Sequence, residues 1–127
     1  METHLNLMKY FIFLLISTYL FNAKADFNTA SEAYNNKSYQ QAFNEFHQLA
    51  QLGNKRAQFN LGAMYLNGEY VEQDIFKAYA WGRLSEHSAR PEFSQIRKNI
   101  ENQLTEAGLE KAEHTFAVIK DTYGGVG

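Results

Sequence analysis

Residues 57–81 read AQFNLGAMYLNGEYVEQDIFKAYAW, and this stretch decides the fold. Its apolar residues recur every three or four positions on both sides of a polar connection, which is the spacing of amphipathic helices. Gly68 is suited to end the first helix, because glycine tolerates the left-handed backbone of a helix C-cap. Asp74 is placed to N-cap the second helix, because its carboxylate can accept free amide hydrogens of the first turn. The stretch therefore predicts a hairpin of two short antiparallel helices.

Small residues are expected to line the seam between the two helices, because they let two helix backbones approach closely. These residues are Gly62, Ala63, Ala78 and Gly82. The rings of Tyr65 and Trp81 then fill the remaining space, which is the usual role of aromatic residues in a helical repeat. We therefore expect both rings to be structural rather than to stack on a ligand.

The same stretch resembles the Sel1-like repeat, a relative of the tetratricopeptide repeat. The resemblance rests on residues at fixed spacings, which are Ala57, Gln58, Leu61, Gly62, Met64, Tyr65, Gly68, Val71, Gln73, Asp74, Lys77, Ala78 and Trp81. It implies an all-α solenoid of helical hairpins that binds proteins and has no catalytic residues. It also implies structural roles within the repeat for Ala57, Leu61, Gly62, Tyr65, Gly68, Asp74, Ala78 and Trp81.

The stretch departs from the repeat pattern at two places. Glu69 and Tyr70 stand where the repeat usually has a small pair after its glycine. Residues 82–88 lack the usual Ala-Ala pair and the terminal glycine. The second departure indicates that the array of hairpins ends there.

Helical spacing elsewhere completes one repeat domain over residues 26–123. Hairpins are expected over 27–53 and 55–89, and two capping helices over 91–123. A flexible tail is expected over 124–127. Ala42 and Ala78, which lie on the apolar faces of their helices, are 36 residues apart. This separation is typical of repeats built from helical hairpins.

The N-terminal residues 1–25 have the composition of a secretory signal peptide. Lys9 precedes an apolar run over 10–21, and an Ala-x-Ala cleavage site follows over 23–25. This pattern predicts cleavage before Asp26, export across the inner membrane, and a periplasmic product without stable membrane insertion. An uncleaved membrane anchor and a buried structural helix remain open, as does translation from Met8 rather than Met1.

The composition excludes several classes of protein. A chain of 127 residues has the length of one domain, and its net charge is −2. Because the charges are mixed, no basic surface for nucleic acid is expected. The chain has no cysteine, which excludes a disulfide framework, a thiolate metal site and a cysteine nucleophile. Its stability must therefore come from apolar packing.

The residues that could carry chemistry do not form a catalytic or metal-binding pattern. His47, His87 and His114 lack zinc-ligand spacing. Glu110 and His114 are four residues apart and could share a metal, but a third ligand is missing. Residues 85–88 contain serine, glutamate and histidine, but a helix end offers neither an oxyanion hole nor the distant partners of a triad. No catalytic residue, metal or cofactor is therefore predicted.

Protein binding is expected on the first helix of each hairpin, because the resemblance implies that these helices line the concave surface of a superhelix. The candidates are positions that the core is not expected to claim: Asn28, Glu32, Asn35, Asn36, Phe59, Asn60, Ala63, Leu66 and Asn67. Phe59 lies off the apolar face of its helix, so it either packs on the previous hairpin or anchors a partner. The alternative is that all these positions are ordinary solvated helix surface.

Together these features predict a non-catalytic protein–protein interaction module in the bacterial cell envelope. The resemblance to Sel1-like repeats implies that it would act as an adaptor, a regulator or an immunity-type inhibitor, with another protein or peptide as its partner. The alternative that the resemblance offers is an envelope hydrolase acting on cell-wall or β-lactam-like substrates. The missing nucleophile, metal set and paired carboxylates argue against that alternative. A structural part of a larger envelope assembly is a third possibility.

Overall fold

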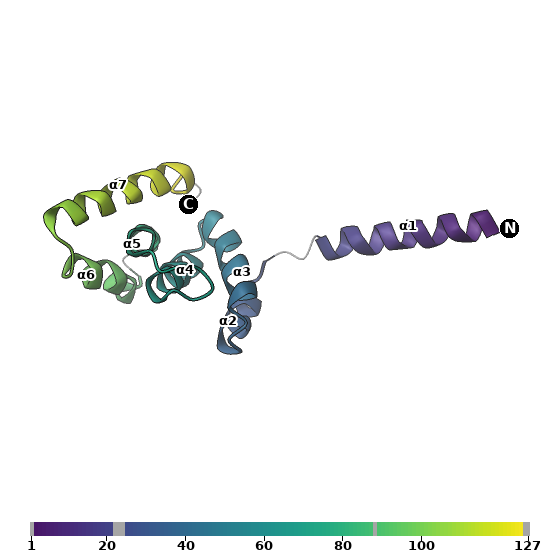
Figure 1. Cartoon of the computed structure of the whole chain (residues 1–127), viewed down its shortest axis with the longest axis horizontal. Coiled ribbons are helices and arrows are strands. Elements are labelled where there is room, and N and C mark those ends of the chain that lie inside the picture. The colour runs from purple at the N-terminus through teal and green to yellow at the C-terminus, as the bar shows by residue number, and fades with distance from the viewer. Residues whose placement is uncertain (1, 22–24, 88, 126–127) are drawn as a thin grey trace.

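The computed structural model describes residues 2–21, 25–87 and 89–125. These residues form seven α-helices and one short 3-10 helix, with no strand among them, so the prediction of an all-α fold is confirmed (Figure 1). The elements are α1 Glu2–Phe21, α2 Phe27–Asn35, α3 Tyr39–Gln51, α4 Lys55–Asn67, α5 Ile75–Leu84, η1 Pro91–Ser94, α6 Gln95–Glu101 and α7 Glu106–Tyr123.

Helices α2 and α3 form the first hairpin, and α4 and α5 form the second. Both hairpins share one apolar cluster, to which α2 gives Ala30, α3 gives Phe46, α4 gives Leu61 and α5 gives Trp81. Buried Gln58 reinforces the junction between the hairpins, because its Nε2 donates to the carbonyl of Ala50 at 3.1 Å. The two hairpins are therefore packed as one unit.

The connection between α4 and α5 uses Gly68 and Asp74 as its capping residues. Gly68 follows α4 with φ of 68°, and its amide donates to the carbonyl of Met64. The carboxylate of Asp74 accepts from the amides of Phe76 and Lys77, each at 3.0 Å. The turn thereby satisfies backbone groups that a helix end would otherwise leave unpaired.

Asp74→Ala is expected to lower the free energy of unfolding by about 1 kcal/mol, the usual loss for an N-cap side chain. The substitution leaves the amides of Phe76 and Lys77 without their acceptor. Denaturant unfolding followed by circular dichroism measures the change. Asp74→Asn keeps an acceptor oxygen and should retain most of the stability, whereas equal losses in both variants would contradict the capping role.

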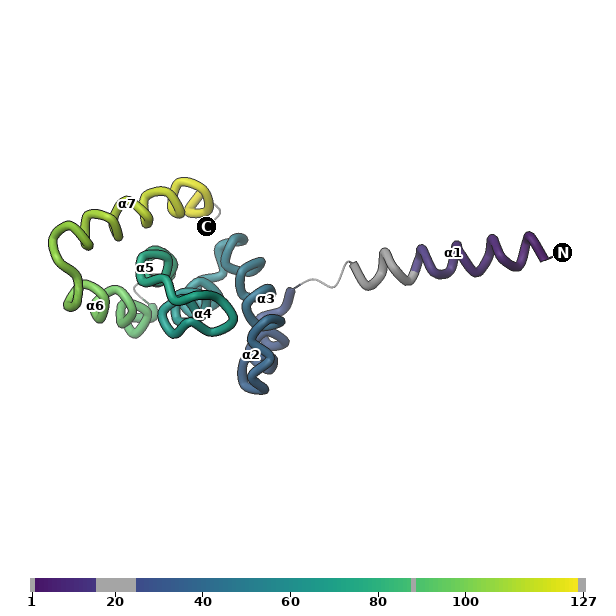
Figure 2. The backbone as a smooth tube through the Cα atoms, in the orientation of Figure 1, coloured from purple at the N-terminus to yellow at the C-terminus, as the bar shows by residue number. Residues whose placement is uncertain are grey.

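The remaining helices cover the end of the array. Helix α7 runs back from α6 past α5 toward α3 (Figure 2). At its end the ring of Tyr123 stacks on Trp81 at 5.5 Å, and its hydroxyl accepts from Gln51 Nε2 at 3.3 Å. A second apolar cluster joins Tyr79 of α5 to Ile96 and Ile100 of α6. We call η1, α6 and α7 together the cap. The cap therefore encloses α5 from two sides.

A polar network borders this second cluster. The hydroxyl of Tyr79 donates to Glu113 at 2.7 Å, and Arg83 forms an ion pair with the same carboxylate. Arg97 pairs with Glu86 at 2.9 Å and with Glu101 at 3.0 Å. The bonds to Glu113 and Glu86 hold α7 and α6 to the second hairpin, whereas the pair of Arg97 with Glu101 lies within α6.

The pKa of Glu113 is lowered by the hydrogen bond from Tyr79 and by Arg83. A carboxyl with a lowered folded pKa stabilises the protein above its ordinary pKa of 4.5, and this stabilisation disappears as the pH falls through the folded value. Glu113→Gln should therefore reduce the Tm at neutral pH and have little effect once the pH lies below the folded pKa. Thermal unfolding of both proteins from neutral to acidic pH tests this prediction. A difference in Tm that does not change with pH would contradict the role of the network.

Helix α1 lies apart from this packing. It projects away from the other helices (Figure 1), and none of residues 2–15 belongs to either apolar cluster. Tyr10, Phe11 and Phe13 are exposed. Within the part of the chain that the structure describes, no helix has both the length and the hydropathy to span a membrane.

Parts of the sequence-based predictions fall on residues outside the described ranges. Residues 22–24 of the expected cleavage region are among them, as are Ser88 and the last two residues of the expected tail. Gly124 and Gly125 of that tail form a turn, in which the Gly124 amide donates to the carbonyl of Lys120 at 2.7 Å.

Candidate protein-binding surfaces

The four candidates of the first hairpin lie on the surface. Asn28, Glu32 and Asn35 are exposed on α2. Asn36 is also exposed and caps the helix, since its amide donates to the carbonyls of Glu32 and Tyr34. The sequence therefore identifies an exposed polar face on α2, and the structure leaves this face open to solvent.

Three candidates of the second hairpin do not form a free surface, which corrects the expectation that the core leaves them unclaimed. Phe59, Ala63 and Leu66 are partly buried against the second apolar cluster. The ring of Phe59 stacks on Phe93 of η1 at 4.8 Å, so it packs on the following cap rather than on the previous hairpin. The reason is that residues of α5, α6 and α7 form the second apolar cluster, which covers this face of α4.

The two asparagines of α4 differ in exposure. Asn60 is half-buried, and Asn67 is exposed. The side-chain amide of Asn67 donates to Glu69 Oε1 at 3.1 Å, which ties it to the connecting loop. Of the nine candidates, the solvent-exposed set is therefore Asn28, Glu32, Asn35, Asn36 and Asn67.

The histidines are packed among aromatic rings or exposed. His47 lies between Phe43 and Trp81, with ring centroids 5.8 Å and 6.3 Å away. His87 contacts the ring of Phe93, and His114 is exposed on α7. Among residues 2–21, 25–87 and 89–125, no three histidine, aspartate or glutamate side chains gather as a metal-ligand set.

Burial lowers the pKa of His47 below its ordinary value of 6.5, and the nearby charge of Lys77 lowers it further. The unfolded chain therefore takes up this proton at a higher pH than the folded chain does. Stability should fall as the pH drops from 6.5 through the folded pKa. His47→Gln should weaken this dependence in denaturant unfolding experiments, whereas an unchanged dependence would contradict it.

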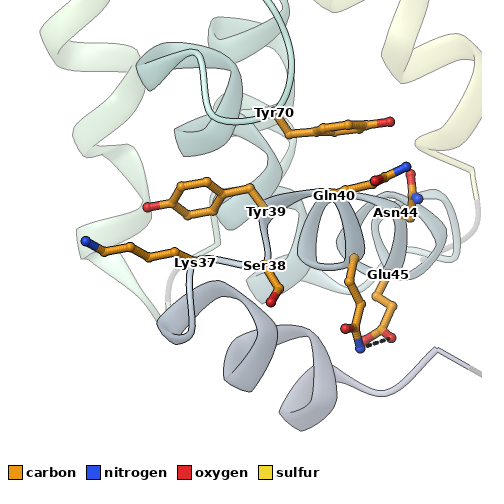
Figure 3. Close-up of a pocket in the computed structure, with 8 residues that line it drawn as sticks. Lys37, Ser38, Tyr39, Gln40, Asn44, Glu45 and Tyr70 are labelled. Carbon is orange, nitrogen blue, oxygen red and sulfur yellow. Dashed lines mark hydrogen bonds between the residues drawn. The ribbon is translucent and has the colours of Figure 1, made fainter.

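An open groove lies between the start of α3 and the loop that joins α4 to α5. It has a volume of about 760 Å³ and is lined by residues 37–41, Asn44, Glu45 and Tyr70. We call it the Tyr70 groove. Figure 3 shows the Tyr70 ring over the side chains of Gln40 and Asn44. Pockets of this size are typical of ligand sites, which range from ~300 to 1,000 Å³.

The loop that carries Tyr70 is held to the first hairpin. Glu69 Oε1 accepts from the hydroxyl of Tyr34 at 3.1 Å. Burial, together with this hydrogen bond, raises the pKa of Tyr34 to about 12, because both favour the neutral phenol. The ring of Tyr70 lies 5.6 Å from the ring of Phe43 on α3. Both residues of the unusual pair therefore act here, Glu69 as a tether and Tyr70 as a groove wall.

The groove was not predicted from the sequence, although the sequence contains one signal for it. That signal is the replacement of a small pair by Glu69 and Tyr70 directly after Gly68. The fixed connection of the hairpin brings this loop to the first turns of α3. The polar residues of α3 give no signal by themselves, because exposed amides are ordinary on any helix.

Comparison with known proteins supports the repeat fold. No family model matches the chain, and no curated protein matches it significantly. A solved structure matches with a TM-score of 0.70 and 28% sequence identity. It is c5321, a protective antigen present in uropathogenic Escherichia coli strains that displays an SLR fold, the fold of Sel1-like repeats. The match covers 80% of this chain and 24% of that chain.

Proposed function

We propose that this Sel1-like repeat protein is a non-catalytic module that binds another protein or a peptide in the bacterial cell envelope. The repeat fold itself suggests protein–protein interaction. The observation that carries the proposal is a preformed surface: two hairpins packed on one apolar cluster leave the polar face of α2 and the Tyr70 groove open.

A preformed surface favours association because little conformational freedom is lost on binding. Ala30, Ala42 and Ala57 are fully buried where the helices meet, which keeps the helices close. Lys55 adds a polar link, because its Nζ donates to the carbonyl of Leu84 at 2.8 Å. The exposed candidates on α2 are therefore held on a rigid support, as helical-repeat binding surfaces are.

The cell envelope is proposed from the N-terminal segment. Lys9, the apolar run over 10–21 and the Ala-x-Ala site over 23–25 support a signal peptide. Exposed apolar residues of α1 that take no part in the domain's clusters agree with a removable segment. N-terminal sequencing of the protein from the source cells tests this: a start at Asp26 supports export, and a start at Met1 or Met8 contradicts cleavage.

The role within the envelope would be that of an adaptor, a regulator or an immunity-type inhibitor of one partner. A preformed repeat module suits the recognition of one protein. An immunity-type inhibitor should form a stoichiometric complex with a toxin and suppress its activity. An adaptor should instead bind two proteins at once, so the composition of the purified complex separates these roles.

Capture of the partner tests the proposed function. The full chain with a C-terminal tag would be expressed in the source cells, cross-linked, and purified for mass spectrometry. We expect one protein to be recovered reproducibly and in stoichiometric amount. A tagged, unrelated periplasmic protein of similar charge is the control. Recovery of the same proteins with both baits would contradict the proposal.

A further inference from the structure

The backbone at Tyr70 is unusual. Its φ is 68°, in the left-handed region that residues with a Cβ atom rarely occupy. The residue is nevertheless 53% exposed, so burial does not account for the conformation. Such outliers persist where the surrounding structure holds them, and they are concentrated at binding and catalytic sites. The conformation displays an aromatic ring at the edge of the groove.

The facing wall offers hydrogen-bonding groups that are free. Gln40 and Asn44 are exposed on α3 and lie beneath the Tyr70 ring (Figure 3). Neither side chain makes a hydrogen bond to another residue within the described part of the protein. Each amide has donors and an acceptor, so it can pair with both the N–H and the C=O of an extended peptide.

The lining of the groove carries one carboxylate, Glu45, and one cation, Lys37. Glu45 Oε1 accepts from Gln41 at 3.2 Å, while Glu45 Oε2 is buried without a hydrogen-bond partner. Such an incompletely satisfied carboxylate favours a nearby cation. Lys37 stands eight residues before Glu45 in the chain, so the Glu45 end of the lining carries a carboxylate and no cation. A ligand with a basic side chain complements this arrangement.

We propose that the Tyr70 groove binds an extended segment of a partner protein that carries one aromatic and one basic side chain. This inference rests on the proposed protein-binding function and specifies its ligand. From Tyr39 to Glu45 the helix rises by about 9 Å, which matches roughly three residues of extended chain. The aromatic side chain stacks on Tyr70, the backbone pairs with Gln40 and Asn44, and the basic group lies near Glu45.

The first test uses short peptides as probes. Amide NMR spectra of the full chain would be recorded with the capped pentapeptide Gly-Trp-Gly-Arg-Gly. We expect saturable shifts at residues 37–45 and 69–71. A peptide with glutamine in place of arginine should bind more weakly to the wild-type chain, and Glu45→Gln should remove this preference. Saturation without shifts at these residues, or no saturable shift with millimolar peptide, would overturn the proposal.

Tyr70→Gly separates binding from folding. Glycine adopts a positive φ without strain, so the variant should keep its Tm while the ring is lost. We expect the affinity for the peptide to fall by about tenfold, as for loss of an aromatic anchor. Leu52→Ala is the control, because Leu52 is 63% exposed at the other end of α3 and outside the groove. Unchanged affinity in Tyr70→Gly would overturn the proposal.

A sugar is the competing ligand for the Tyr70 groove, because a tyrosine ring with neighbouring amides also suits a carbohydrate. Chitotriose is therefore titrated into the full chain in the same NMR experiment. We expect no saturable shift at residues 37–45 and 69–71. Shifts there with chitotriose and none with the peptide would overturn the peptide assignment.

Partner capture separates failure of the groove from failure of the proposed function. The tagged wild-type chain and the tagged Tyr70→Gly chain are compared as baits, and we expect the variant to recover less of the partner. If both chains capture the same partner equally, the assignment of the Tyr70 groove as the binding site is wrong, and the proposal of a binding module stands. If the wild-type chain captures no partner, the proposed function itself fails.

Discussion

Trp81→Ala is expected to lower the free energy of unfolding by about 3–5 kcal/mol, the usual range for truncating a large buried aromatic residue. Trp81 is 3% exposed and belongs to the cluster that joins the two hairpins. Its ring stacks on Tyr123 and meets His47 edge-on. The substitution therefore opens a cavity in the shared core and removes the contact that holds the end of α7.

Denaturant unfolding followed by far-ultraviolet circular dichroism measures this loss. Val118→Ala is the matched control, because Val118 is 53% exposed on α7 and its truncation should change stability by less than about 0.5 kcal/mol. If Trp81→Ala also cost less than about 1 kcal/mol, the role of Trp81 as the joint between hairpins and cap would be contradicted.

Gly62→Ala is expected to destabilise the protein by about 1–3 kcal/mol through overpacking of the α4–α5 seam. A Cβ atom at Gly62 would lie 3.0 Å from the Gly82 nitrogen and 3.2 Å from the Ala78 carbonyl oxygen. Both neighbours are backbone atoms of α5, so they can move only if the helices separate. The usual gain in helix propensity from glycine to alanine is smaller than this loss.

Gly108→Ala is expected to change the stability in the opposite direction in the same unfolding experiment. A Cβ atom there would meet the end of the Leu104 side chain at 3.1 Å, and that flexible group can move aside. Gly108 lies in the first turn of α7, where alanine should raise stability by up to about 1 kcal/mol. Equal effects of the two substitutions would show that helix propensity, rather than the close approach of α4 and α5, decides the result at Gly62.

The second hairpin could be predicted from sequence because its signals are local. Gly68 and Asp74 act within a few residues of their own positions, as helix caps do. The small residues Gly62 and Gly82 face each other because the short connection fixes the pairing of α4 with α5. Local signals of this kind survive without knowledge of the rest of the fold.

The position of the cap could not be predicted in the same way. Phe59 faces Phe93 across 34 residues of chain, and no pattern in the sequence states which face of α4 the cap covers. Helical spacing alone also places Leu109 on the inner face of α7, whereas it is 37% exposed. The spacing of apolar residues identifies one face of a helix, but packing against other helices decides how much of that face is buried.

The two candidate surfaces also differ in whether the sequence could predict them. The polar face of α2 could be proposed from sequence, because Asn28 and Glu32 lie off its apolar stripe. The Tyr70 groove could not, because it combines α3 with a loop whose conformation depends on the tether from Tyr34 to Glu69. Only the departure from the repeat pattern at Glu69 and Tyr70 pointed to it.

The most direct test of the binding-module account is calorimetric titration of the purified protein with its purified captured partner. The account predicts a saturable complex of fixed stoichiometry. It also predicts a negative heat-capacity change from buried apolar surface, and unchanged helix content of the module. A captured protein that gives no saturable heat, or binding that requires unfolding of the hairpins, would contradict the account.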